Sequence, residues 1–159
     1  MTRLVLLDNT VLSNFAVVGR MDLAFQLYAN RVVTTQGVMH EYQVAVAAGL
    51  LARRAWDDLT VVEMTSEELV LCETLAPRLG IGERTCLAVA HARGGLFVSD
   101  DGDARAAAKR LDVPVSGTVG ILVLAVRLEY ATLAEANALL IEMIAAGYRS
   151  PLRVLDTLV

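Results

Sequence analysis

Residues 3–8 read R-L-V-L-L-D, a short apolar run that stops at the carboxylate of Asp8. An unbroken apolar run of this length predicts a buried β-strand, because strands covered on both faces of a parallel sheet are apolar throughout. The pattern recurs in L-F-V-S-D-D-G-D at residues 96–103. Both stretches therefore predict core strands whose carboxyl ends present acidic side chains.

Strand-like and helix-like segments alternate along the rest of the chain. This alternation predicts an α/β fold in three α/β/α layers, with a central, mainly parallel sheet covered by helices on both faces. No internal repeat or linker divides the sequence, so we expect one domain over residues 1–159. Further strands are expected at 32–35, 59–64 and 114–116, and helices at 10–18, 21–29, 36–51, 65–80, 82–93, 104–111 and, as two or three segments, after 118.

The composition is unusually apolar, with 55% hydrophobic residues and a mean hydropathy of +0.52. The longest uncharged apolar stretch, Val113 to Val126, is too short for a membrane span and contains Pro114 and Gly117. The N-terminus lacks the small-residue cleavage site of a secretory signal. We therefore expect a cytoplasmic protein with no membrane segment that buries apolar surface as a homodimer or as one half of a complex.

Charge and cysteine content exclude several protein classes. A net charge of −4 and a pI near 5.1 argue against a non-specific nucleic-acid coat protein, which would be basic. Cys72 and Cys86 lie outside any CxxC pattern, so they predict neither a disulfide framework nor a zinc site. We expect both to be small core residues.

Acidic residues gather at one place in the predicted sheet. In an open parallel sheet ligands bind at the carboxyl ends of the strands, where Asp8 and the loop acids after residue 99 would meet. Glu83 begins a helix after Gly82, and Glu41 lies on or beside the buried stripe of its helix. The candidate site acids are Asp8, Glu41, Glu83, Asp100, Asp101 and Asp103.

Convergent carboxylates favour a bound cation. Two carboxylates about 4 Å apart repel by roughly 4 kcal/mol at an effective dielectric near 20. Hard divalent ions with oxygen ligands relieve this repulsion, so we expect Mg²⁺ or Mn²⁺, and no His or Cys cluster favours zinc. Such ions generate a nucleophilic water and steady the leaving oxygen of a phosphodiester. The pattern therefore predicts hydrolysis of nucleic acid.

Each acid also has an ordinary structural explanation. Asp8 could cap the helix that follows it, and we expect Asp101 or Asp103 to cap the helix near Ala104. Glu83 could be a favourable first-turn acid, and Glu41 could be a solvated side chain. The metal-site hypothesis rests on the order in which all four regions carry acids.

At these motifs the chain resembles PIN-domain nucleases, including the prokaryotic toxin–antitoxin (VapC-like) subgroup. The likeness lies in L-L-D-N-T-V-L-S-N-F around Asp8, M-H-E-Y around Glu41, L-G-I-G-E-R-T-C-L-A-V-A around Glu83, L-F-V-S-D-D-G-D-A-R from Leu96 and S-G-T-V-G-I-L-V-L-A from Ser116. It implies a metal-dependent endonuclease acting on single-stranded RNA, in many members a toxin with an antitoxin partner. Many members carry Asp where this chain has Glu83.

The resemblance also suggests individual roles. Asp8, Glu41 and Glu83 match three of the family's acids and Asp101 matches the fourth through the S-x-D pattern. Which of the three loop acids touches the metal stays open. We expect Thr10 to contribute its hydroxyl and Arg84 or Arg105 to contact phosphate, although Arg105 could instead pair with Asp101.

The sequence leaves two other functions open, a phosphatase and a non-catalytic interaction module. Asp8-Asn9-Thr10 is the D-x-T start of a haloacid-dehalogenase-type phosphatase, but Thr10 stands where those enzymes usually carry a second Asp, and Lys109 follows the late acids instead of preceding them. A non-catalytic interaction module would keep the acids as caps and surface charges. A phosphoryl group trapped on Asp8 would support the first, and absence of stabilisation by Mn²⁺ would support the second.

Overall fold

The computed structural model describes residues 3–51, 56 and 59–159. At its centre is a five-stranded sheet in the order β3-β2-β1-β4-β5, in which all neighbouring strands run parallel. The predicted α/β fold with a parallel sheet is confirmed. The strands are β1 (Val5–Leu7), β2 (Val32–Thr35), β3 (Thr60–Val62), β4 (Leu96–Val98) and β5 (Val115–Ser116).

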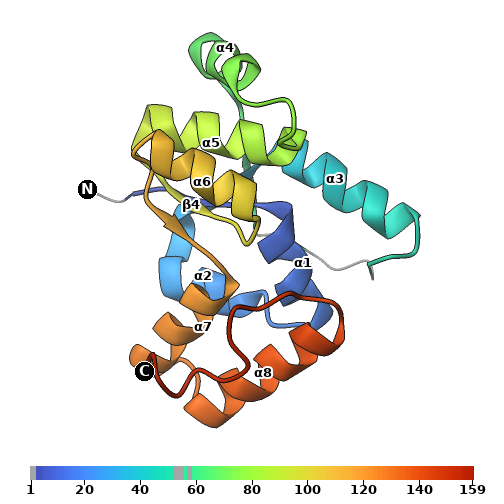
Figure 1. Ribbon diagram of the computed structural model, residues 1–159, viewed down its shortest axis with the longest axis vertical. Coiled ribbons are helices and arrows are strands. Elements are labelled where there is room, and N and C mark those ends of the chain that lie inside the picture. The colour runs from blue at the N-terminus through green and yellow to red at the C-terminus, as the bar shows by residue number, and fades with distance from the viewer. Residues whose placement is uncertain (1–2, 52–55, 57–58) are drawn as a thin grey trace.

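Helices flank this sheet, as a three-layer arrangement requires. In Figure 1, α5 and α6 lie on one side of the strands, and α2 and α7 lie on the other. In the described part of the chain, no helix has the length and apolar character that a bilayer crossing needs. The helices are α1 (Asn9–Val17), α2 (Asp22–Tyr28), α3 (Gln36–Ala47), α4 (Ser66–Thr74), α5 (Ile81–Arg93), α6 (Gly102–Arg110), α7 (Thr118–Arg127) and α8 (Leu133–Ala145), with a 3₁₀ turn η1 (Ala29–Arg31).

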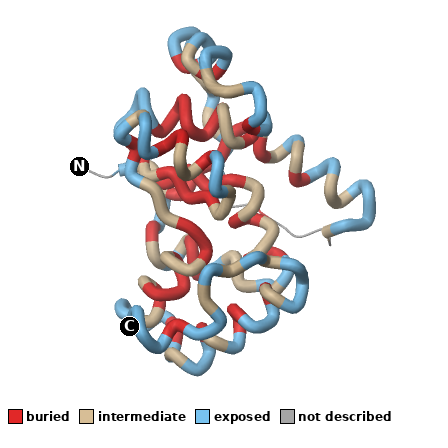
Figure 2. The backbone as a smooth tube through the Cα atoms, viewed as in Figure 1, coloured by how far each residue is buried: buried red, intermediate tan, exposed pale blue. Residues whose placement is uncertain are grey.

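The core consists of the apolar strands and the helix faces packed on them. Leu6, Phe97 and Leu87 are fully buried, and buried segments run through the middle of the molecule in Figure 2. Cys72 and Cys86 are free and buried, as predicted. Burial of each large apolar side chain contributes about 1.5–3 kcal/mol, so the sheet is a rigid base for the residues at its edge.

The register of the central strands sets the position of the acidic loops. Val5 of β1 pairs with Leu96 of β4, and Leu7 pairs with Val98, so the two strands end level with each other. The backbone N–H of Asp8 then donates to the carbonyl of Val98 at 3.0 Å. The predicted meeting of the two acidic strand ends at one edge of the sheet is therefore confirmed.

Two predicted helices end earlier than expected. The helix predicted to reach residue 51 stops at Ala47, because Gly49 adopts a left-handed φ of 74° and turns the chain away. The helix predicted to reach Gly80 stops at Thr74. Pro77 lacks an N–H and disfavours the helical conformation in the residue before it, which explains the early end.

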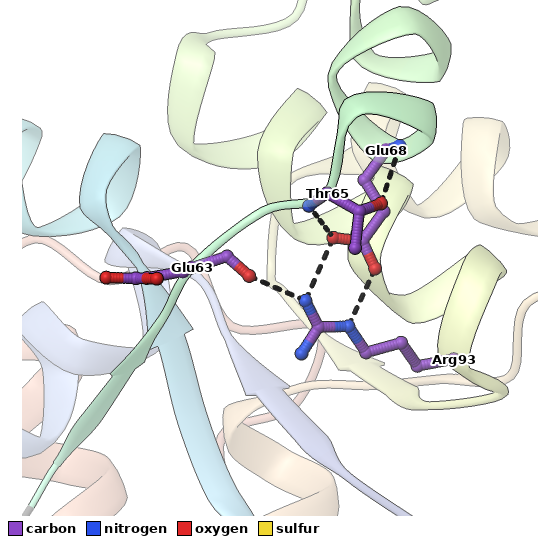
Figure 3. A network of polar contacts seen from close by, with 4 residues as sticks. All are labelled: Glu63, Thr65, Glu68 and Arg93. Carbon is purple, nitrogen blue, oxygen red and sulfur yellow. Dashed lines mark hydrogen bonds and ion pairs between the residues drawn. The ribbon is translucent and has the colours of Figure 1, made fainter.

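A polar network joins the start of α4 to the last turn of α5 (Figure 3). The Arg93 guanidinium donates to both carboxylate oxygens of Glu68, at 2.6 and 2.9 Å, and to the carbonyl of Glu63 at 2.7 Å. Glu68 also completes a capping box with Thr65. The carboxylate of Glu68 is almost fully buried, so this network fixes α4 on α5.

Replacing Glu68 with Gln should lower the free energy of unfolding by about 1–3 kcal/mol near neutral pH, because Arg93 loses a charged partner. The Arg93 hydrogen bond, with help from the Thr65 N–H, lowers the pKa of Glu68 below its usual 4.5 despite burial. Ionised Glu68 therefore stabilises the fold fully at pH values above 4.5, and this stabilisation is lost as the pH falls through the lowered pKa. Chemical denaturation of both proteins at several pH values measures this, with exposed Glu67→Gln as the matched control.

Candidate functional site

Asp8 lies buried at the edge of the sheet where β1 and β4 end, which we call the acidic edge. Its side chain follows β1, caps α1 and is only 1% exposed. One carboxylate oxygen accepts from the N–H of Asn9 at 2.7 Å, and the other accepts from the hydroxyl of Ser99, at the end of β4, at 2.8 Å. The hydroxyl of Thr10 lies 3.3 Å from the same oxygen as Ser99. The expected capping role of Asp8 is confirmed, and the carboxylate also joins the two central strands.

The surroundings of Asp8 disfavour its negative charge. Burial raises the pKa of Asp8 from 3.8 to about 7, against the lowering effect of the Ser99 hydrogen bond. The negative charges of Glu83 and, less strongly, Glu41 raise this pKa further. The ionised carboxylate is thus unfavourable in the protein alone, and a nearby cation would relieve it.

Glu41 and Glu83 meet at the turn that begins α5. Glu41, from α3, accepts from the N–H of Gly82 at 3.0 Å, and Glu83 accepts from the N–H of Gly80 at 2.7 Å. A Cβ atom at Gly82 would lie 2.7 Å from a Glu41 carboxylate oxygen, so only glycine permits this close approach. Burial, and then the charge of Asp101, raises the pKa of Glu83.

The three loop acids have different surroundings. Asp101 caps α6 by accepting from the N–H of Ala104 at 2.8 Å, as predicted for one of these residues. Asp103 is exposed, and its carboxylate lies 3.9 Å from the guanidinium of Arg78. Of these loop acids, Asp101 raises the pKa of Glu83 more than Asp103 does, although burial is the larger cause.

Asp100 binds other parts of the protein. One of its oxygens accepts from the N–H of Thr118 at 2.8 Å and from the Tyr148 hydroxyl at 3.3 Å. The other accepts from the Thr118 hydroxyl at 2.5 Å and from the Asn14 amide at 3.0 Å. These four donors join α1, α7 and the segment after α8, so the carboxylate of Asp100 is already satisfied by protein.

The predicted substrate contacts also differ in their positions. Thr10 lies within the acidic group, where its hydroxyl accepts from the N–H of Asp100 at 3.1 Å. Arg105 lies beside it and donates from one nitrogen to the carbonyls of Ser99 and Ser116 at 2.8 and 2.9 Å, so it does not pair with Asp101. Arg84 faces α4, where its charge acts on Cys72, and its Nε has no hydrogen-bond partner among the described residues.

The carboxylate oxygens of these residues are ligands that suit a hard divalent cation, although the side chains do not surround a common position for one. The acids offer oxygen atoms alone, and the charges of their acidic neighbours add to the effect of burial in raising the pKa values of Asp8 and Glu83. Among the described residues, no three His, Cys, Asp or Glu side chains lie close enough together to form a metal-holding cluster. The predicted metal ligands are thus neighbours without coordination geometry.

Several contributing residues were absent from the sequence-based hypothesis. Ser99 follows a strand directly and could have been noticed from its place in the S-D-D motif. Thr118 and Tyr148 carry no local signal that would link them to Asp100, because they come from α7 and from the segment after α8. Only the packing of these segments shows the connection.

Comparison with known proteins adds one finding. A family model described as a PIN domain matches residues 4–159. No curated protein and no solved structure matches the chain significantly.

Replacing Asp8 with Asn should stabilise the metal-free protein at alkaline pH. The raised pKa of Asp8 means that the folded state holds its proton more tightly, so the wild type loses about 4 kcal/mol of this contribution as pH rises from about 4 to about 7. Asn does not ionise and avoids the loss. Denaturation in EDTA between about pH 5 and about pH 8 should show the variant gaining on the wild type. A constant difference across this range would contradict the buried, strained carboxylate.

Replacing Gly82 with Ala should displace Glu41 without unfolding the protein. The new methyl group would meet the flexible end of Glu41, and alanine favours a helix by about 1 kcal/mol over glycine. The thermal shift produced by Mn²⁺ should therefore shrink while the melting temperature in EDTA stays close to that of the wild type. Gly102→Ala, at the start of α6 with open space around it, is the matched control. An unchanged Mn²⁺ shift in Gly82→Ala would show that Glu41 does not contribute to Mn²⁺ binding.

Proposed function

Because the chain belongs to the PIN-domain family, whose members are generally nucleases, we propose that it is a divalent-metal-dependent endoribonuclease acting on single-stranded RNA. One observation carries the proposal beyond family membership. Asp8 is buried at the carboxyl edge of the sheet with its pKa raised by burial and by Glu83 and Glu41. This excess of negative charge favours a cation at the place where parallel α/β sheets bind ligands.

Mg²⁺ or Mn²⁺ is the proposed cofactor, with Asp8, Glu83 and Asp101 as the residues that would hold it. Asp101 is preferred because Asp100 already accepts four hydrogen bonds and Asp103 is exposed to solvent. When bound, the cation would supply Lewis acidity and an activated water.

The other residues of the group would support the chemistry by position. Glu41, whose carboxylate accepts from the N–H of Gly82, would act as a further ligand or orient the attacking water. Thr10 and Ser99 would keep the Asp8 carboxylate in place through their hydroxyl groups. Arg105, held by two backbone carbonyls, would offer its remaining N–H groups to phosphate.

A protein partner is part of the same proposal. Large apolar side chains are exposed on α4 and α8, among them Leu69, Val70 and Ile141. Such side chains fit a homodimer contact or an antitoxin that covers the chain when it acts as a toxin. Sedimentation of the purified protein, alone and with an adjacent-gene product, would distinguish these partners.

A non-catalytic interaction module is the second candidate. The observations that favour it are that Asp101 is engaged as a helix cap, Asp103 pairs with Arg78, and the acids form no closed cluster among the described residues. This alternative predicts no RNA cleavage and no stabilisation by Mn²⁺.

The decisive experiment is cleavage of an internally labelled single-stranded RNA with Mg²⁺ or Mn²⁺. Internal cuts should appear with wild type and disappear in EDTA, and Asp8→Asn should reduce the rate by at least about 100-fold, because loss of a ligand exceeds loss of a supporting contact. Asp101→Asn should behave similarly.

Asp112→Asn is the matched control for this experiment. Asp112 is exposed beyond α6, and its left-handed φ of 56° is one that Asn adopts readily. Its activity should equal that of wild type. Cleavage that persists in EDTA or in Asp8→Asn would contradict the proposed mechanism, and absence of both cleavage and an Mn²⁺ shift would favour the interaction module.

A further inference from the structure

A hollow of about 560 Å³ lies beside the acidic edge of the sheet. Its walls come from the end of β5, the start of α7 and the segment Tyr148–Pro151, with Asp100 between them. A second hollow of about 430 Å³ shares Asp100 and Arg149 with the first and is also lined by Thr10 and Asp101. The two hollows thus connect the proposed catalytic acids with the segment after α8.

The first hollow has a positive character although the chain is acidic. Arg105 of α6 and Arg149, which follows α8, both line it. Arg149 is exposed and has neither a hydrogen bond nor an ion pair with any described residue. The one carboxylate in its wall, Asp100, already accepts four hydrogen bonds from protein donors, so the two guanidinium groups outnumber the acidic groups of the wall.

Two glycines, Gly117 and Gly120, line this hollow. A Cβ atom at Gly117 would lie 2.6 Å from an Asp100 oxygen and 3.0 Å from the Arg105 guanidinium. At Gly120 a Cβ atom would collide with the Ser116 hydroxyl. These two backbone positions therefore pack directly against the polar side chains that line the hollow, and a side chain at either position would displace them.

We propose that this hollow binds a backbone phosphate of the RNA strand, away from the bond that is cut, with Arg149 as its main contact. The proposal rests on the proposed RNA substrate and adds a second place where the strand is held. Planar guanidinium groups bind phosphate through paired hydrogen bonds, and an unpaired one loses no existing partner on binding. A strand could pass from Asp101 along the second hollow to Arg149.

Asp100 and Tyr148 act as positioning residues in this arrangement. The Tyr148 hydroxyl donates to Asp100, and Arg149 is the next residue in the chain. The hydrogen bond therefore fixes the segment that carries Arg149 against the end of β4. Burial, followed by the charge of Asp100, raises the pKa of Tyr148, so its hydroxyl keeps the proton that makes this contact at ordinary pH.

Fluorescence anisotropy with a short labelled single-stranded RNA tests the proposal. The titrations are made in EDTA, so that binding is measured without cleavage. Arg149→Gln should raise Kd about tenfold, and the salt dependence of log K should become shallower by about 0.7, the value for one phosphate contact on a single strand. Arg149→Lys should keep the salt dependence while losing part of the affinity.

Arg110→Gln is the matched control, because Arg110 is exposed in the last turn of α6 and lines neither hollow. It should bind RNA as the wild type does. A parallel titration with inorganic phosphate identifies the source of the phosphate group. Tight binding of inorganic phosphate without measurable RNA binding would overturn the proposal, as would an unchanged salt dependence in Arg149→Gln.

The outcomes separate this proposal from the proposed nuclease activity. RNA binding that depends on Arg149 would support the phosphate site even if the wild type cut no RNA. RNA cleavage by the wild type with an unchanged salt dependence in Arg149→Gln would support the nuclease and overturn the phosphate site.

Discussion

The carboxylate of Asp8 lies where β1 and β4 end side by side, and the other features of the site depend on its burial there. Ser99 and Asn9 hold its two oxygens, and its own N–H joins the carbonyl of Val98. A charge in this position is unfavourable by itself, which the pKa of about 7 reflects. Packing of the apolar strands tolerates it, since a domain core contributes far more than one buried group removes. Such local strain is characteristic of functional sites.

The acids around Asp8 are held in place by interactions that are themselves ordinary. Glu83 accepts from the N–H of Gly80, Glu41 accepts from the N–H of Gly82, and Asp101 caps α6. Helix caps thus serve to point carboxylates at a common edge, because helix N-termini and strand ends meet there in a parallel fold. A structural role and a place in the candidate metal site are therefore compatible for the same side chain.

The neighbourhood of the acidic group divides into two regions of opposite charge. Asp100 separates them: it belongs to the acidic loop in sequence, yet four hydrogen bonds turn it into a support for α7 and for the segment after α8. Arg105 and Arg149 line the hollow that Asp100 also lines. The proposed RNA strand would use both regions, one for the reacting phosphate and one for a neighbouring phosphate.

The sequence by itself determined the α/β class, the strands that end in acids and their meeting at one edge, because apolar runs and helix periodicity depend on local side-chain order. It also indicated Asp8, Glu41, Glu83 and the loop acids as a group. Only the tertiary structure showed that Asp100, Asp101 and Asp103 have different partners, and only it placed Arg84 near α4 and joined Tyr148 to Asp100. These differences depend on contacts between residues far apart in the chain, which pattern and propensity do not encode, since side-chain direction is set by the packing of whole helices.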